Sequence, residues 1–460
     1  MMPPSQMTTR SWLCSSTATC VLPALLVLLA LSDVSADDWP QWRGQHRDGK
    51  SPETGLLQQW PEGGPPLAWS AGGIGAGYSG VSIADGRIYS MGDLADGQYV
   101  FALDEGSGEL LWKTRVGSIH DDSRPGPRST PTVDGGSVFV MTTEGDVVCL
   151  ASKSGEQVWR RSMTEDFKGY LMKAMGSYDW KFSESPLVDG DRVVVTPGHV
   201  EAMLVALNRK TGEELWRTQG KRLGPRGADG AGYASVTVAE IAGTRQYIQL
   251  VGRGVIGVDA ESGRLLWGYN EVANDIANIS MPIVRGDYIF ASSGYGTGSG
   301  LIKIGRSDSE FTVDQIYFLD ADTLQNHHGG LILHGDTVFT GTGHNKGFPI
   351  AVDFMTGKVA WGPERTAGKD SSVVTYADGR LYFRYRDGRM ILVEATSEAY
   401  RERGSFVIPE VKKESWSHPS IANGKLFLRE QDSVHCYDIA APRETGEATS
   451  DAASRAERDS

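Results

Sequence analysis

Polar and aromatic residues stand just ahead of eight short apolar blocks along the 460-residue chain. Brought into one cavity, carboxylates, an amide, cations and rings of these types suit a polyanionic or polyhydroxylated ligand. Any one of them can equally be a polar residue on the wall of a wet channel. The residues in these positions are Tyr78, Arg128, Asp179, Trp180, Glu184, Tyr233, Asn278, His327, His328, Lys369, Asp370, Trp416 and His418.

Other chemistries have little support in the sequence. It contains no GxSxG, HExxH, CxxC, P-loop or calcium-loop string, which argues against a nucleophile elbow and an HExxH zinc site. His327 and His328 are adjacent, and neighbours on an extended segment point to opposite faces. We therefore expect a structural role for this pair, or a single histidine that faces a pocket, and no shared metal ion.

A repeat of eleven residues organises the elements that must position these side chains. Five copies share one internal spacing: a small residue, an Asp-like position, Ser or Thr before Gly, and Trp at the end. This pattern is typical of a strand, a tight turn whose Gly takes a positive φ, and a second strand led by Trp. We expect each indole to cover the gap to a neighbouring sheet. The copies are Ala102–Trp112, Cys149–Trp159, Ala206–Trp216, Gly257–Trp267 and Ala351–Trp361.

Eight apolar hairpins precede or follow these copies, and each carries the turn chemistry of inner blade strands. Eight positions fit an outer strand of a blade: 69, 112, 159, 216, 267, 317, 361 and 406. Their spacing is near the length of a four-stranded blade. The last hairpin is not followed by an outer strand, whereas Leu67–Trp69 resembles one that lacks a hairpin. We predict an all-β, eight-bladed β-propeller of four-stranded antiparallel blades, closed by an N-terminal strand that removes the sheet edges.

The ends of the chain carry different signals. Residues 1–36 read as a signal peptide, because Arg10 precedes an apolar run at Val21–Leu31 and a small-residue cleavage pattern. That run is too short to span a membrane. We predict a strap over residues 37–66, the propeller over 67–439, and a disordered tail over 440–460, rich in Ala, Ser, Glu and Arg.

Charge and cysteine usage narrow the function further. The formal net charge of −13 argues against nucleic acid as a partner. With the signal removed, Cys149 and Cys436 remain, and both fall on the small-residue position of a third strand, in blades two and eight. We expect two buried core residues and no disulfide. A periplasmic or secreted protein is predicted.

The five copies resemble the tryptophan-docking repeat of dehydrogenases that use pyrroloquinoline quinone (PQQ), and of PQQ-like propellers such as the outer-membrane assembly factor BamB. Asp38–Gly44, Glu184–Gly190 and Gln325–Gly330 resemble phrases of an exported bacterial subfamily of PQQ-like proteins. The resemblance implies the propeller fold over nearly all of the mature chain. An adjacent Cys pair and long caps, which many of the dehydrogenases have, are missing from this sequence.

A PQQ site would need Ca²⁺ held by oxygen ligands, cations for the carboxylates of the quinone, a stacking ring and a free carboxylate base. The residue types for such a site are present. Glu184 and Asn278 are the candidate metal ligands, and Asp370 and Asp179 are the candidate catalytic bases. The candidate cofactor-binding residues are Arg128, Trp180, Tyr233, His327, Lys369 and His418.

Three functions stay open at this stage. The first is a binding module that takes a small-molecule or polymer ligand, or an envelope protein, through the central funnel. The second is an oxidoreductase of alcohols, sugars or polyols that depends on PQQ and calcium. The third is an envelope assembly scaffold similar to BamB, which would need a docking patch and no cofactor.

Overall fold

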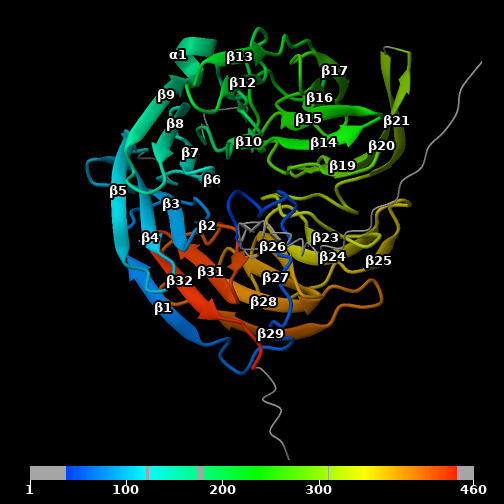
Figure 1. Ribbon diagram of the computed structural model, residues 1–460. Coiled ribbons are helices and arrows are strands. Elements are labelled where there is room, and N and C mark those ends of the chain that lie inside the picture. The colour runs from blue at the N-terminus through cyan, green and yellow to red at the C-terminus, as the bar shows by residue number, and fades with distance from the viewer. Residues whose placement is uncertain (1–37, 121–123, 173–179, 309, 443–460) are drawn as a thin grey trace, which may run out of the picture. The chain divides into compact units, whose positions relative to one another are not determined.

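The computed structural model describes residues 38–120, 124–172, 180–308 and 310–442, all of which belong to one compact unit. The predicted signal peptide and the predicted tail beyond residue 442 lie outside the described residues. Eight antiparallel sheets of four strands each form the unit and follow one another around a ring (Figure 1). The predicted eight-bladed β-propeller is confirmed.

Each blade contributes one strand to each of four concentric positions. The innermost strands are β2 (Ser82–Ala84), β6 (Thr132–Asp134), β10 (Leu187–Asp189), β14 (Thr237–Ile241), β18 (Ile283–Arg285), β22 (Ile332–His334), β26 (Ser372–Ala377) and β30 (Ser420–Ala422). The second strands are β3 (Arg87–Leu94), β7 (Ser137–Met141), β11 (Arg192–Val195), β15 (Thr244–Val251), β19 (Tyr288–Ser293), β23 (Thr337–Thr342), β27 (Arg380–Tyr385) and β31 (Lys425–Glu430). The third strands are β4 (Gly97–Asp104), β8 (Asp146–Ala151), β12 (Val205–Asn208), β16 (Gly254–Asp259), β20 (Gly298–Ser307), β24 (Phe348–Asp353), β28 (Arg389–Glu394) and β32 (Ser433–Asp438). The outer strands are β5 (Leu110–Gly117), β9 (Gln157–Ser162), β13 (Glu214–Arg217), β17 (Leu265–Tyr269), β21 (Glu310–Leu319), β25 (Val359–Trp361), β29 (Glu402–Val407) and β1 (Leu67–Gly72).

The eighth blade joins the two ends of the ring. Its sheet has the order β1-β32-β31-β30, so its outer strand comes from the N-terminal side of the propeller and the other three from the C-terminal side. Trp69 lies opposite Cys436 in this pairing. The closure by an N-terminal strand is therefore confirmed, and it gives β32 a partner on its outer side.

The hydrophobic core lies between neighbouring blades, and the repeat's Trp residues bridge them. Trp159 of the second blade donates from Nε1 to the Arg209 carbonyl of the third blade at 2.9 Å. A Cβ on Gly212, the motif glycine of the third blade, would lie 2.8 Å from the same indole. Gly212 has a φ of +72°, so the turn and the indole both require glycine at this position.

Most other outer-strand rings dock in the same way. A side-chain donor reaches a carbonyl of the following blade from Trp69 to Glu105, from Trp112 to Ser152, from Tyr317 to Phe354 and from Trp361 to Thr396. Gly108 and Gly155 lie under the rings of Trp69 and Trp112 as Gly212 lies under Trp159. The repeat thus encodes contacts between blades as well as the turn within each blade.

The strap, described from residue 38 onward, enters the middle of the ring (Figure 1). Trp39 pairs with Ile83 of β2, and the Pro40 carbonyl accepts from Val133 of β6. Arg47 donates to the carbonyls of Ser185 and Pro186, ahead of β10, and Arg43 donates to that of Leu331, ahead of β22. Lys50 pairs with Tyr376 of β26.

The rest of the described chain adds one short helix, two buried cysteines and a pairing near the start of the predicted tail. A single short helix, α1 (Met163–Phe167), is found in the described part of the chain and is capped by Ser162. No helix among the described residues is long and apolar enough to cross a membrane. Cys149 and Cys436 are free and buried. Ala440 bridges to Leu56 of the strap, so the predicted tail begins with paired residues.

Candidate functional site

A cavity of about 480 Å³ opens at the funnel, within the range typical of ligand pockets. Its walls combine aromatic rings, imidazoles, guanidinium groups and hydroxyls. The lining residues are Trp42, Tyr78, Arg124, Arg128, Trp180, Ser183, Ser185, Tyr233, Ser235, Ile279, Tyr295, His327, His328, His344, Asn345, Arg386, Trp416 and His418.

Two kinds of loop supply this lining, apart from Trp42 of the strap. One kind runs from an outer strand to the next inner strand and carries residues such as Tyr78, Arg128 and His418. The other is the turn between a second and a third strand, which carries Tyr295, His344 and Arg386. Both kinds open on the same face of the ring, so residues far apart in sequence meet in one cavity.

Guanidinium groups surround Trp416 at one side of the cavity. The Arg124 guanidinium carbon lies 5.2 Å from the centre of the Trp416 ring, and that of Arg386 lies 5.7 Å from it. Glu414 holds this arrangement, because Arg386 donates to its carboxylate at 3.1 Å. The Tyr78 hydroxyl donates to the same carboxylate at 3.1 Å, and Arg128 lies over the Tyr78 ring.

The histidines of the cavity are neutral at physiological pH. Burial is the main reason why the pKa of His328 and of His418 is lowered to about 3, with a smaller contribution from neighbouring arginines and, for His328, from neighbouring imidazoles. Burial likewise lowers the pKa of His327 and His344 below the usual range. Each neutral imidazole offers one donor and one acceptor, so the positive charge of the cavity comes from its arginines.

His327 and His328 both line the cavity, and their ring centroids lie 4.0 Å apart. The prediction of at most one pocket-facing histidine was wrong. Its premise fails because the segment bends at these two residues and is not extended. The ring of His344 is tilted against that of His327 at 4.4 Å between centroids, and the Tyr295 hydroxyl lies 3.1 Å from His327 Nε2.

Several polar atoms of the lining are buried without a partner in the described part of the chain. They are His327 Nδ1, His344 Nδ1, His418 Nδ1 and Trp416 Nε1. A buried polar atom with no hydrogen bond costs free energy, and a bound ligand or water relieves that cost. The four residues that carry these atoms line the cavity, which makes it the candidate binding site.

The structure brings together eight of the residues singled out in the sequence. Arg128, Trp180, Tyr233, His327 and His418, all candidate cofactor-binding residues, line the cavity. Tyr78, His328 and Trp416 line it as well. Trp180 packs edge-on against Tyr233 at 5.6 Å between ring centroids.

Glu184, a candidate metal ligand, lies behind the wall of the cavity. Its carboxylate accepts from the backbone and the hydroxyl of Thr196 at 2.8 and 3.0 Å, and from Gln249 at 3.4 Å. Burial raises the pKa of Glu184 to about 8, against the opposing effects of the Thr196 bonds and of Arg47. Its contacts are thus with neighbouring strands of the propeller.

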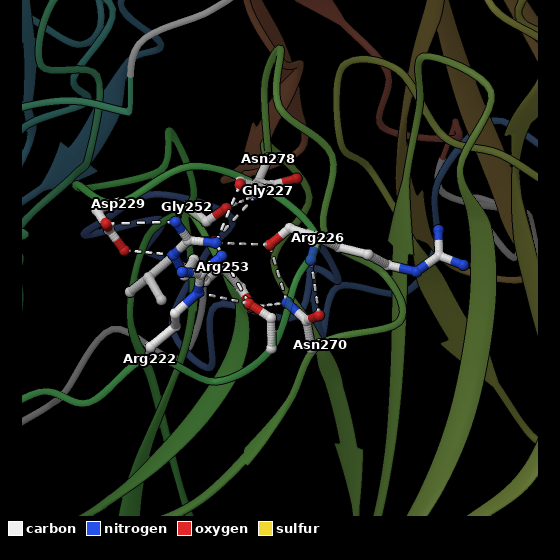
Figure 2. Close-up of polar contacts among 10 residues, drawn as sticks. Arg222, Arg226, Gly227, Asp229, Gly252, Arg253, Asn270 and Asn278 are labelled. Atoms are coloured by element: carbon white, nitrogen blue, oxygen red, sulfur yellow. Dashed lines mark hydrogen bonds and ion pairs between the residues drawn. The ribbon is translucent and has the colours of Figure 1, made fainter.

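Asn278, the other candidate metal ligand, is buried and bonded to backbone. Its Nδ2 donates to the Val251 and Gly252 carbonyls at 3.1 and 3.0 Å, and its Oδ1 accepts from the backbone of Asn274. Figure 2 shows Asn278 beside Gly252. Arg253, which follows Gly252 in the sequence, binds Asp229 and donates to the backbone carbonyls of Arg226 and Gly227. Asn278 therefore supports a loop of the funnel face.

Lys369 and Asp370 lie in a separate, more open depression beside the cavity. Both are exposed, and Asp370 lies 3.6 Å from Arg386, which lines the cavity and the depression alike. Asp179, the second candidate base, lies outside the described residues.

Sequence reasoning missed Trp42, Arg124, Tyr295, His344 and Arg386. It considered the residues ahead of the inner strands, whereas Tyr295, His344 and Arg386 lie in turns between second and third strands. A polar or aromatic residue in each of those turns is a signal that a wider search of the sequence would have found. Trp42 belongs to the strap, whose position has no counterpart in the repeat.

The described residues do not fit a calcium-bound quinone. Ca²⁺ takes about six to eight oxygen ligands, with carboxylates prominent among them. The cavity lining contains no carboxylate in the described part of the chain, and no group of three or more His, Cys, Asp or Glu residues described there is placed to hold a metal ion.

Comparisons with known proteins agree with the fold. BamB of Burkholderia pseudomallei is 30% identical over 235 residues, which cover 49% of this chain and 54% of that protein. The 1-butanol dehydrogenase (quinone) of Thauera butanivorans is 31% identical over 141 residues, which cover 30% and 22%. The matches thus span about half or less of these curated relatives.

Solved structures share the architecture at low sequence identity. BamB of Moraxella catarrhalis superposes with a TM-score of 0.56 and 14% identity over 81% of this chain and 97% of that one. Quinohemoprotein alcohol dehydrogenase ADHIIG of Pseudomonas putida HK5 gives 0.61 and 14% over 88% and 81%. A family model described as outer membrane protein assembly factor BamB matches residues 96–363, more than half of the chain. On this match, the chain belongs to the BamB-like family of PQQ-like β-propellers.

Proposed function

We propose that the protein is a binding module whose funnel takes a small-molecule or polymer ligand that carries a carboxylate, sulfate or phosphate group. One observation carries this proposal: arginines and neutral imidazoles line the cavity, and no carboxylate does in the described residues. Arginine matches the geometry of such oxyanions, because its fork of donors binds two oxygens at once.

The aromatic lining supports a ligand with a ring next to the anionic group. Trp42, Trp180, Trp416, Tyr78, Tyr233 and Tyr295 give the cavity apolar faces on which a ring can stack. The acidic surface of the protein as a whole does not oppose this, because the positive charge is local to the funnel.

Titration calorimetry with the full chain tests the proposal. The probes are inorganic sulfate, inorganic phosphate, citrate and galacturonate, measured at low ionic strength. We expect at least one probe to bind, and Arg386→Gln to weaken it about tenfold to a hundredfold, in line with the loss of a charge-assisted hydrogen bond. Arg365→Gln, at an exposed arginine outside the cavity lining, is the matched control. Equal affinity in wild type and Arg386→Gln would reject the proposal.

A second candidate is a role in the assembly of envelope proteins, favoured by the family match and by the BamB relatives. For this role we propose a location in the bacterial envelope, periplasmic or secreted. Deletion of the gene should then lower the content of outer-membrane proteins, and a copy carrying Arg386→Gln should restore it. Failure of that copy to restore it would connect the phenotype to the funnel instead.

PQQ is a further probe in the same titration, with and without Ca²⁺, because a quinone-dependent dehydrogenase is among the relatives. Tight calcium-dependent binding, followed by dye-linked oxidation of an alcohol or sugar, would replace the binding module with an oxidoreductase. Asp179 and Asp370 would then be the first residues to substitute.

A further inference from the structure

The strap lies on the central axis of the ring, and the proposed function does not yet give it a role. Within twelve residues, from Trp39 to Lys50, it contacts the first, second, third, sixth and seventh blades through the backbone and side-chain bonds described above. Trp42 also contacts the loops that lead into the fifth and eighth blades. Its Nε1 lies 3.0 Å from Met281 Sδ, and its ring centroid lies 4.4 Å from that of His418. A short segment reaches seven blades of a ring only from its central axis.

The strap is held firmly in that position. Arg43 and Arg47 are buried, and their guanidinium groups bind backbone carbonyls of opposite parts of the ring. Trp39 is buried against Ile83, and its ring lies 3.0 Å from the Cβ position of Gly44, so the strap also packs on itself. Many simultaneous bonds of this kind favour a fixed plug over a mobile segment.

Trp42 is the part of the plug that the ligand would meet. It lines the cavity together with His418, which lies at the start of the eighth blade. The cavity is thus bounded by the strap at its inner end and by the loops of the funnel face at its mouth.

The walls suit a ligand with several hydroxyl groups. Among the described residues, the unpartnered nitrogens of His327 and His344 belong to the sixth blade and those of Trp416 and His418 to the loop that leads into the eighth, and all four residues line one cavity. Ser183, Ser235 and Asn345 add further donors and acceptors. Such a distribution matches hydroxyls around a sugar ring, aromatic faces match its apolar face, and arginine matches a carboxylate on it.

We propose that the strap makes the funnel a blind pocket with Trp42 as its floor, so that the protein binds the free end of an acidic glycan and not an internal stretch of one. This inference rests on the proposed binding of an oxyanion and adds the ligand class and its direction. The end of the chain reaches Trp42, its carboxylate meets the arginines near Trp416, and the rest of the glycan leaves through the mouth. A ring without a plug would let a polymer pass through.

Stoichiometry tests the direction of binding. Full-length protein is titrated with oligogalacturonate trimers and with a longer oligomer of about ten units, each of defined length. End-on binding predicts one protein per glycan chain for both, with affinities within about threefold of each other. A number of bound proteins that grows with glycan length would overturn the end-on proposal while leaving the oxyanion site in place.

The role of Trp42 is tested on the trimer. Trp42→Ala should weaken binding at least tenfold, and Trp42→Phe, which keeps a ring, should weaken it less. Trp60→Ala is the matched control, because Trp60 also belongs to the strap but packs against Tyr382 and Phe406, outside the cavity lining. Trp60→Ala should leave the affinity within about twofold even where it lowers the melting temperature as much as Trp42→Ala does.

The two proposals fail in different ways. If Trp42→Ala binds the trimer as wild type does, the floor is overturned. If no galacturonate oligomer binds but sulfate or phosphate binds and needs Arg386, the glycan inference is overturned and the oxyanion site stands. If no anionic probe binds, both proposals fall.

Discussion

Arg386 donates to the carboxylate of Glu414 at 3.1 Å, so a cation of the funnel is already matched by an internal anion at its rim. Glu414 also accepts from Tyr78 and lies 3.8 Å from Arg124. Burial and Glu414 both raise the pKa of Tyr78, which keeps the phenol protonated as a donor. A ligand carboxylate would therefore compete with Glu414 for the same donors.

This competition leads to the first prediction. Glu414→Gln removes the internal negative charge but keeps a side chain of the same shape that can accept from Tyr78. We expect anionic probes to bind about threefold to tenfold more tightly, as calorimetry at low salt will show, with the gain reduced at high salt because the effect is electrostatic. The exposed Glu398→Gln is the control. A loss of affinity in Glu414→Gln would mean that Glu414 orders the arginines more than it competes.

The second prediction concerns the docking of Trp159 on Gly212. Gly212→Ala introduces a Cβ 2.8 Å from the indole at a φ of +72°. Gly190→Ala meets a similar φ of +62° with nothing within 4 Å, so it measures backbone strain alone. We expect Gly212→Ala to lower the free energy of unfolding by about 1–3 kcal/mol more than Gly190→Ala in urea denaturation. Equal losses would show that the indole yields without cost.

The third prediction separates two roles of Asn278. As a backbone anchor it needs its amide donor for the carbonyls of Val251 and Gly252. Asn278→Asp places a carboxylate against these carbonyls, so it should lower the free energy of unfolding by about 1–3 kcal/mol or more and leave calcium affinity unchanged. If Asn278 were a calcium ligand, the added charge would instead make thermal stability rise with Ca²⁺ concentration.

The fourth prediction addresses the buried pair of Arg384 and Glu430, whose side chains are 0% and 2% exposed and 3.0 Å apart. Arg384→Met leaves the carboxylate buried without its cation, and Glu430→Gln leaves the guanidinium without its anion. Each should cost about 3–5 kcal/mol of unfolding free energy, whereas the double variant should cost less than the sum. Additive losses in chemical denaturation would contradict a direct coupling.

The fifth prediction follows from the buried histidines. The pKa of His328 and of His418 is lowered to about 3 and that of His435 to about 4, from an ordinary value of 6.5. Between pH 6.5 and these values the unfolded chain binds protons that the folded protein does not, so stability is full above pH 6.5 and falls as the pH drops. The slope is up to about 1.4 kcal/mol per pH unit for each histidine.

His418→Gln should remove one share of this acid slope, measured as unfolding free energy from pH 7 to pH 4. The exposed His46→Gln serves as the control and should keep the wild-type slope. The slope is the readout, because it is independent of any constant loss of stability that His418→Gln causes. An unchanged slope would show that His418 takes up a proton in the folded state.

The repeat explains why the fold could be predicted in such detail. The spacing of the repeat alone placed Trp69 and Trp159 on outer strands and located the seam at Leu67. This was possible because the eleven residues of the repeat contain both the turn and the Trp that contacts the neighbouring blade. Gly212 takes the positive φ that the motif predicts.

The candidate site was only partly predictable, for physical reasons. Arg128 and His418 were found because several of the loops ahead of inner strands line the cavity. Asn278 occupies such a loop too, but its amide is used by backbone carbonyls, which a sequence does not display. Trp42 was out of reach, because the strap is positioned by bonds to carbonyls spread over distant blades.

The seam in the eighth blade affects how the protein folds during its synthesis. Because β1 lies next to β32, the first strand to leave the ribosome waits for nearly the last one before it has a partner. Until then the strand and the strap before it expose edges and indoles that the finished ring conceals. The ring can therefore close only after β32 has been synthesised. A truncation that removes β32 should leave an open ring that is prone to aggregation.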